Sequence, residues 1–103
     1  MGARPQPFNL FFEMLFLENY SELGLKEKKA IDRAVQLLSE NPRHPSLQVH
    51  KAKNVKGKYP VGGAGVFIAY ATTDLRITFE YGPDPGTIAL RNCGFHDVCE
   101  TKI

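Results

Sequence analysis

The chain has 103 residues, 43% of them hydrophobic, so it is long enough for one domain with a single core and too short for two. Its two cysteines, in a sequence without a secretory signal, argue against a disulfide framework and predict a cytoplasmic protein with reduced thiols. The net charge of +2 hides an asymmetry, because residues 41–73 carry five of the 13 basic residues and none of the 11 acidic ones.

The first residues, 1–7, are expected to be a disordered leader, and residues 8–103 a single domain. The apolar stretch 8–16 is interrupted by polar residues and is shorter than the ~20 residues of a membrane-spanning helix. It also lacks the basic run and the cleavage site of a signal peptide. We therefore expect no membrane association, and both Met1 and Met14 are candidate start residues.

The next part of the chain, 21–42, has the period of an amphipathic helix. Apolar residues recur on one face, charged residues fill the other, and Asn41 and Pro42 end the pattern. A shorter helix or turn from Phe16 to Leu23 precedes this helix and is broken at Gly24. Two helices joined by so short a break predict an antiparallel helical hairpin.

A lysine-bearing segment begins after the helix. Such a segment is typical either of a phosphate-binding surface or of a solvated lysine loop, and the charge pattern alone does not decide between these two interpretations. A glycine-rich stretch at 61–65 ends the segment and is expected to be a flexible connection, because it lacks the following helix and the lysine of a phosphate-binding loop. The candidate RNA-binding residues here are Lys51, Lys53, Lys56 and Lys58.

Three strands are predicted in the second half, at 66–71, 75–81 and 87–92. The middle strand alternates cleanly between apolar and polar residues, which predicts one face in the core and one face in water. Residues 82–86, "GPDPG", have the composition of a turn.

The expected pairing of the last two strands puts two arginines together. Pairing Phe79 with Ile88 places Arg76 directly opposite Arg91. Like charges in that position cost stability, so the strands are either simply exposed or hold an anion between the two guanidinium groups. If the turn at 72–74 is short, Tyr70 falls beside Arg76 as a stacking ring.

Histidines flank this face in the sequence. An imidazole gives or takes a proton near neutral pH, so His50 and His96 beside paired arginines suggest metal-free cleavage of RNA through the ribose 2′-hydroxyl. Each has a plainer reading as well. His50 fits a surface histidine in a basic loop. His96 has Asp97 as its neighbour in the sequence, but the side chains of adjacent residues often point apart, so the two need not form a pair.

The cysteines and one histidine form a C-x2-H-x2-C cluster of Cys93, His96 and Cys99. These are three zinc-ligand types with no fourth ligand nearby, and Cys93 is expected on the exposed strand face with Cys99 beyond it. We therefore expect neither a metal nor a cofactor.

The order of these parts resembles a known family. A helix, "LLSENPRHPSL", a basic stretch, "GVFIAYATTDLRITFEY", a turn and "IALRNCGFHD" are together similar to the RelE/ParE superfamily of bacterial toxin–antitoxin toxins, closest to RelE-like and YafQ-like mRNA interferases, from about Phe12 to Asp97. The resemblance implies an α+β fold in which two N-terminal helices pack on a small, mainly antiparallel, twisted sheet.

The resemblance also implies a function. RelE-type members are endoribonucleases that cleave mRNA on the ribosome and are silenced by a cognate antitoxin, so the expected partners are the ribosome, mRNA and an antitoxin protein. ParE-type members instead inhibit DNA gyrase and lack the nuclease residues. The alternatives are therefore a gyrase inhibitor or a catalytically inactive relative that only binds an antitoxin.

The resemblance assigns the candidate catalytic residues by position. It makes His96 the general acid, His50 the general base or its partner, Arg76 the ligand of the scissile phosphate, and Asp74 the group that orients a histidine. Arg91 joins Tyr70 and the lysines as a candidate RNA-binding residue, on the strength of the strand register.

Overall fold

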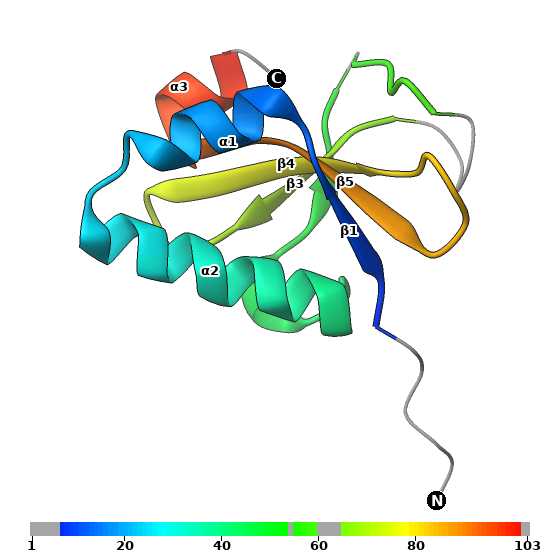
Figure 1. Ribbon diagram of the computed structural model, residues 1–103, viewed down its shortest axis with the longest axis horizontal. Helices are drawn as coiled ribbons and strands as arrows, with labels where there is room; N and C mark the ends of the chain where they lie inside the picture. Colours follow the sequence, from blue (N-terminus) through cyan, green and yellow to red (C-terminus); the bar gives the residue numbers. More distant parts are fainter. Residues whose placement is uncertain (1–6, 54, 60–64, 102–103) are drawn as a thin grey trace, which may run out of the picture.

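The computed structural model describes residues 7–53, 55–59 and 65–101. Most of the expected leader and of the glycine-rich connection, residues 1–6 and 61–64, lies outside them. The predicted α+β class is confirmed. The elements in chain order are β1 (Asn9–Phe12), α1 (Met14–Ser21), α2 (Leu25–Glu40), a 3₁₀ turn (Pro45–Leu47), β2 (His50–Lys51), β3 (Phe67–Tyr70), β4 (Leu75–Tyr81), β5 (Thr87–Phe95) and α3 (His96–Thr101) (Figure 1).

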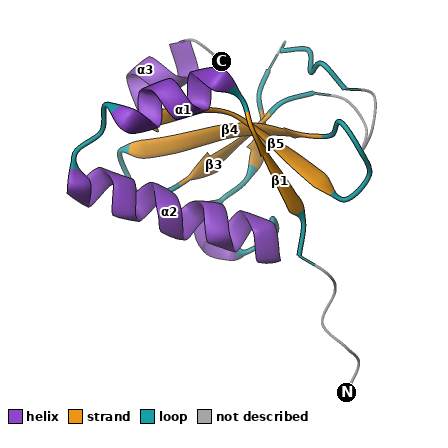
Figure 2. Ribbon diagram, viewed as in Figure 1, coloured by secondary structure: helices purple, strands orange, loops and turns teal. Residues whose placement is uncertain are grey.

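The strands form one five-stranded sheet in the order β1-β5-β4-β3-β2. β1 runs parallel to β5, and the other neighbours are antiparallel. The helices α1 and α2 lie against the same face of this sheet, and α3 packs on β4 and β5 (Figure 2). None of the described helices is long and apolar enough to cross a membrane.

The predicted helical hairpin is confirmed. Gly24 caps the start of α2, which runs back beside α1, and Asn41 caps its end (Figure 1). The apolar stripe of α2 is buried at Ile31, Ala34 and Leu38. It meets the core-facing residues of β4 and β5, so the core lies between the hairpin and the sheet.

The predicted alternation of β4 is confirmed, but its second face is not exposed. Ile77 and Phe79 point into the core. On the opposite face Arg76, Thr78 and Glu80 are only 8%, 0% and 1% exposed. The segment 55–59 and α3 cover this face, which a periodic pattern in one strand does not reveal.

The predicted register of β4 and β5 is wrong. Phe79 pairs with Leu90 rather than with Ile88, because the connection between the strands spans all of 82–86. A β-bulge next to Phe79 then leaves Arg91 as the extra residue of β5 and shifts the register by one more position. Arg76 consequently faces Gly94, and the two arginines do not oppose each other.

Candidate active site

Three side chains from three strands form a row on the face of the sheet that is turned away from α2. Tyr70 of β3 pairs with Arg76 of β4, and the guanidinium carbon of Arg76 lies 3.6 Å from the centre of the Tyr70 ring. The imidazole of His50, on β2, packs edge-on against the same ring with 6.1 Å between the ring centres. The predicted contact of Tyr70 with Arg76 is therefore confirmed, and a cation–π stack joins the two.

The guanidinium of Arg76 is held by the turn before its own strand. Its Nη1 donates to the carbonyl oxygens of Thr72, Thr73 and Leu75 at 3.1, 2.9 and 3.3 Å. Carbonyl dipoles on one side and an aromatic face on another fix a permanent positive charge near the start of β4. The alternation in the sequence predicted the face on which Arg76 lies, but it did not predict its hydrogen bonds to these carbonyl groups.

His96 lies next to this turn. Its backbone N–H donates to the carbonyl oxygen of Asp74 at 2.8 Å, so α3 begins beside the turn that precedes Arg76. The side chains of Asp74 and His96 are both exposed. On β5, Gly94 is the residue that pairs with Arg76, and a Cβ added to Gly94 would meet no atom within 4 Å. The structure thus brings Asp74, Arg76 and His96 to one end of the sheet, where the buried Gly94 leaves room for one more carbon atom.

His50 is also oriented by the backbone. Its Nδ1 lies 3.1 Å from the carbonyl oxygen of Gln48. When Nδ1 carries the proton and donates to this carbonyl, Nε2 is the nitrogen that accepts a proton. The imidazole is exposed, so a ligand over Tyr70 has access to it.

The lysines of the basic segment differ in their surroundings. Lys51, Lys53 and Lys56 are exposed. Lys58 is exposed as well, but it donates to Glu13 Oε1 at 2.9 Å, and this hydrogen bond raises the pKa of Lys58. The charge of Lys58 is therefore already balanced by a carboxylate.

Arg91 belongs to a second ionic network rather than to a pair with Arg76. Its Nη1 lies 2.6 Å from Oε2 of Glu80, which is almost fully buried. The other carboxylate oxygen of Glu80 accepts the backbone N–H of Tyr59 at 3.1 Å, and the Tyr59 hydroxyl donates to Glu13 at 3.2 Å. Arg91 thus balances a buried charge that holds the segment 57–59 against the sheet.

The two cysteines point in different directions. The thiol of Cys93 donates to the carbonyl of Phe16 at 3.7 Å within the core, so the expectation that Cys93 lies on the other strand face is wrong; the bulge at Arg91 changed the alternation. The thiol of Cys99 donates to the carbonyl of Arg76 at 3.8 Å. Burial raises the pKa of Cys93 to about 12. In the part of the chain that the structure describes, no three metal-ligating side chains gather.

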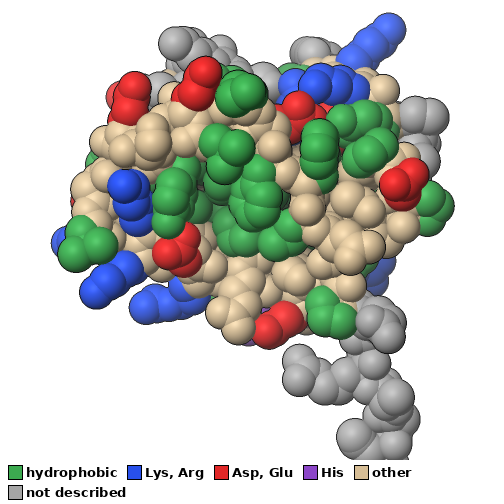
Figure 3. All heavy atoms as spheres, viewed as in Figure 1, with side chains coloured by type: hydrophobic (Ala, Val, Ile, Leu, Met, Phe, Trp, Pro, Cys, Tyr) green, Lys and Arg blue, Asp and Glu red, His purple; other side chains and the backbone are tan. Residues whose placement is uncertain are grey.

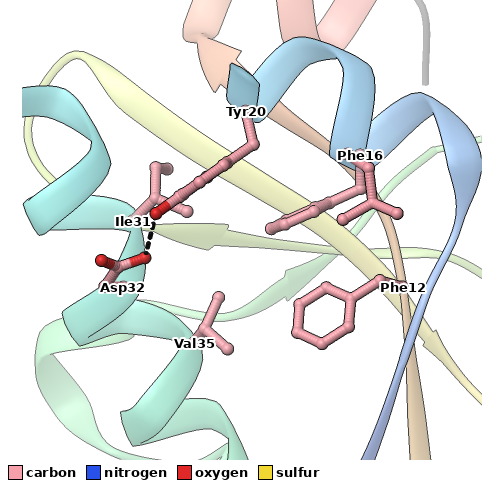
Figure 4. A pocket seen from close by; sticks show the side chains of 7 residues that line it. Phe12, Phe16, Tyr20, Ile31, Asp32 and Val35 are labelled. Atoms are coloured by element: carbon pink, nitrogen blue, oxygen red, sulfur yellow. Dashed lines mark hydrogen bonds between the residues drawn. The ribbon is translucent and has the colours of Figure 1, made fainter. Parts of the chain in front are cut away.

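An apolar groove that the sequence did not reveal lies between β1, α1 and α2. Figure 3 shows a patch of hydrophobic side chains there, and Figure 4 shows the groove from close by, with the Tyr20 hydroxyl donating to Asp32 at 2.7 Å. Large apolar residues at 10–17 were visible in the sequence, but not the fact that the fold leaves several of them uncovered. The groove, of about 280 Å³, is lined by Phe12, Phe16, Leu17, Tyr20, Ile31, Asp32 and Val35.

No protein-family profile and no curated protein matches the chain. Solved structures do match over nearly its whole length. RelE from Pyrococcus horikoshii, solved in complex with RelB, is 11% identical, with 86% of this chain and 94% of that chain covered and a TM-score of 0.66. YafQ from E. coli is 12% identical (88% and 96% covered, TM-score 0.62). YoeB from Staphylococcus aureus, solved as a dimer, is 20% identical (91% and 99% covered, TM-score 0.58). At these identities the likeness concerns the fold, and the chain has the fold of the RelE-like toxins.

Proposed function

We propose that this chain is the toxin of a type II toxin–antitoxin system and acts as a ribosome-dependent mRNA endonuclease. The shared fold with RelE, YafQ and YoeB supports the toxin role. The observation that carries the nuclease reading is the row of His50, Tyr70 and Arg76. It offers a proton acceptor, a ring on which a base stacks and a fixed positive charge, on a face that ends beside His96.

The proposed reaction uses the neighbouring ribose as nucleophile. His50 takes the proton of the 2′-hydroxyl, and the 2′-oxygen attacks phosphorus as the bond to the 5′-oxygen breaks. His96 gives a proton to that leaving oxygen, so the products are a 2′,3′-cyclic phosphate and a 5′-hydroxyl. Arg76 stabilises the charge that develops on the phosphate oxygens. Asp74 orients His96, and no metal or cofactor takes part.

Substrate binding follows from the same face. Tyr70 stacks on a base of the single-stranded message, and Lys51 and Lys53 contact its phosphates. Lys56 extends this contact, whereas Lys58 serves it less because Glu13 already pairs with it. Arg91 contributes indirectly, by holding Glu80 and the segment above it.

We further propose that a cognate antitoxin protein binds the chain and silences it in the cytoplasm. Two structures with this fold were solved as complexes with such partners, RelE with RelB and YafQ with DinJ. Co-expression with the partner should therefore restore growth that the toxin alone arrests.

Expression in a bacterium separates the possible targets. Induction of the wild type should stop translation and cut mRNA within coding regions, as mapped by primer extension, while plasmid supercoiling stays normal. The His96→Gln variant, with its fold verified by circular dichroism, should leave mRNA whole and growth unaffected. Relaxed plasmids together with intact mRNA would instead identify a gyrase inhibitor. If the wild type does not arrest growth, and both mRNA and plasmid supercoiling stay normal, the chain is a catalytically inactive relative.

A further inference from the structure

A second basic surface lies on α2, outside the candidate active site. Lys26, Lys29 and Arg33 follow one another along one stripe of the helix, because residues three or four apart share a face. They line a hollow of about 630 Å³. Lys and Arg side chains project beside the first turns of α2 at the lower left of Figure 3. The remaining lining residues are Leu25, Ala30 and Thr72.

These three cations are not balanced by a carboxylate within the hollow. None of them forms an ion pair with another of the described residues, and no acidic side chain lines the hollow. Like charges three and four positions apart on a helix repel one another, so this stripe is more stable with an anion across it. The other lysine of this helix turn, Lys28, faces the opposite way and lies over the Tyr20 ring at 5.6 Å.

The basic stripe connects with the candidate active site around the end of the sheet. A smaller hollow, of about 260 Å³, shares Lys26, Ala30 and Thr72 with the first and extends to Glu27, Asp74 and Phe95. Asp74 is the residue whose carbonyl binds the backbone of His96. A ligand seated on α2 therefore lies next to one that occupies the candidate active site.

The lining also indicates the kind of ligand. Proteins bind single-stranded RNA largely by stacking its bases on aromatic rings, but they bind double-stranded RNA mainly through its backbone. The hollow on α2 has no aromatic residue, whereas the candidate active site has Tyr70. We propose that Lys26, Lys29 and Arg33 bind the sugar-phosphate backbone of double-stranded RNA while the message lies over Tyr70. This inference rests on the proposed function, because the duplex would belong to the ribosome that holds the message.

Binding to a short RNA hairpin tests the proposal without any cleavage. Fluorescence anisotropy would give the dissociation constant at several salt concentrations for the wild type and for a variant carrying Lys26→Gln, Lys29→Gln and Arg33→Gln. Losing three phosphate contacts should weaken duplex binding on the order of tenfold and reduce the slope of log K against log salt by about 3. Binding of a single-stranded RNA of equal length should change much less.

Lys28→Gln is the matched control, because it removes the same charge from the same helix. We expect Lys29→Gln alone to reduce the salt slope by about 1 and Lys28→Gln to leave it unchanged. Equal effects of these two substitutions, a wild-type slope in the triple variant, or a loss confined to single-stranded RNA would each overturn the proposal.

The two proposals fail separately. A wild type that binds duplex RNA through the stripe but leaves ribosome-bound mRNA whole would end the proposed function and keep this surface. If the wild type cuts mRNA but the triple variant binds the hairpin as tightly as the wild type, the proposed function stands and the duplex-binding surface is refuted.

Discussion

Single residues show that the two arginines of the sheet are held by different partners. The guanidinium of Arg76 donates to three carbonyls and stacks on a ring, at the start of β4. Arg91 sits at a bulge and is occupied by a buried carboxylate. The same residue type therefore has two roles, and only the contacts distinguish them.

Removing Arg91 should destabilise the fold more than it affects RNA binding. Arg91→Ala leaves the carboxylate of Glu80 buried without its partner, which we expect to lower the free energy of unfolding by about 3 to 5 kcal/mol in urea denaturation. In the double variant with Glu80→Gln most of that loss should disappear, because no charge is then stranded. A free energy of unfolding within about 1 kcal/mol of the wild type, as for an exposed ion pair, would contradict this role.

The thiol of Cys93 gives a pH-dependent prediction. Burial raises its pKa from 9.0 to about 12, so between these values the unfolded chain loses a proton that the folded chain keeps. The unfolded state then binds fewer protons, and stability falls as pH rises through this window. Comparing denaturation of the wild type and of Cys93→Ala at pH 8 and pH 10 measures this. The wild type should lose more stability, and equal losses would show that the thiol ionises in the folded state.

At the scale of elements, much of the fold was predictable and its connections were not. The period of α2 and the alternation of β4 are local, and they gave the hairpin and the residues of β4 correctly. The bulge at Arg91 and the wide turn at 82–86 determine register, yet neither leaves a clear periodic signal. β2 and α3 are short elements that form by packing on neighbours, so the sequence alone did not predict them.

The candidate site was predictable to the same degree. His50 pairs with Ile68, two residues from Tyr70 on β3, and Tyr70 pairs with Arg76, so the three candidate side chains share a face. Alternation with a short turn predicts the contact of Tyr70 with Arg76. The covering of that face depends on where the segment 55–59 folds back, which is a tertiary contact. The basic stripe of α2 was visible only as the polar face of a helix, because its neighbours come from the distant turn at Thr72.

The covering segment itself can be tested at Gly57. An added Cβ there would collide with the carboxylate of Glu80, so Gly57→Ala should detach the segment 55–59 from the sheet. Limited digestion should then show faster tryptic cleavage after Lys56 and Lys58 than in the wild type. Gly24→Ala is the control, because its Cβ meets only the flexible end of Glu27. Unchanged cleavage in Gly57→Ala would mean that the Glu80 contact does not hold the segment.

At the scale of the molecule, the proposed active site and the proposed duplex-binding surface meet at the turn 72–74. The face with Tyr70 accepts an unpaired strand, and α2 presents charge without rings. We therefore expect free single-stranded RNA to be a poor substrate of the purified protein. Both surfaces are engaged together only where a single strand lies beside a duplex.

The most direct test of the nuclease proposal is cleavage of a ribosome-bound message by the purified protein, with mapped ends. The wild type should cut and leave a 2′,3′-cyclic phosphate, and a message with one 2′-deoxy nucleotide at the cut position should stay whole. His96→Gln should slow cleavage by about 10²-fold or more, as expected for a lost general acid. Cleavage of the deoxy-substituted message at the same position, or full activity of His96→Gln, would contradict the account.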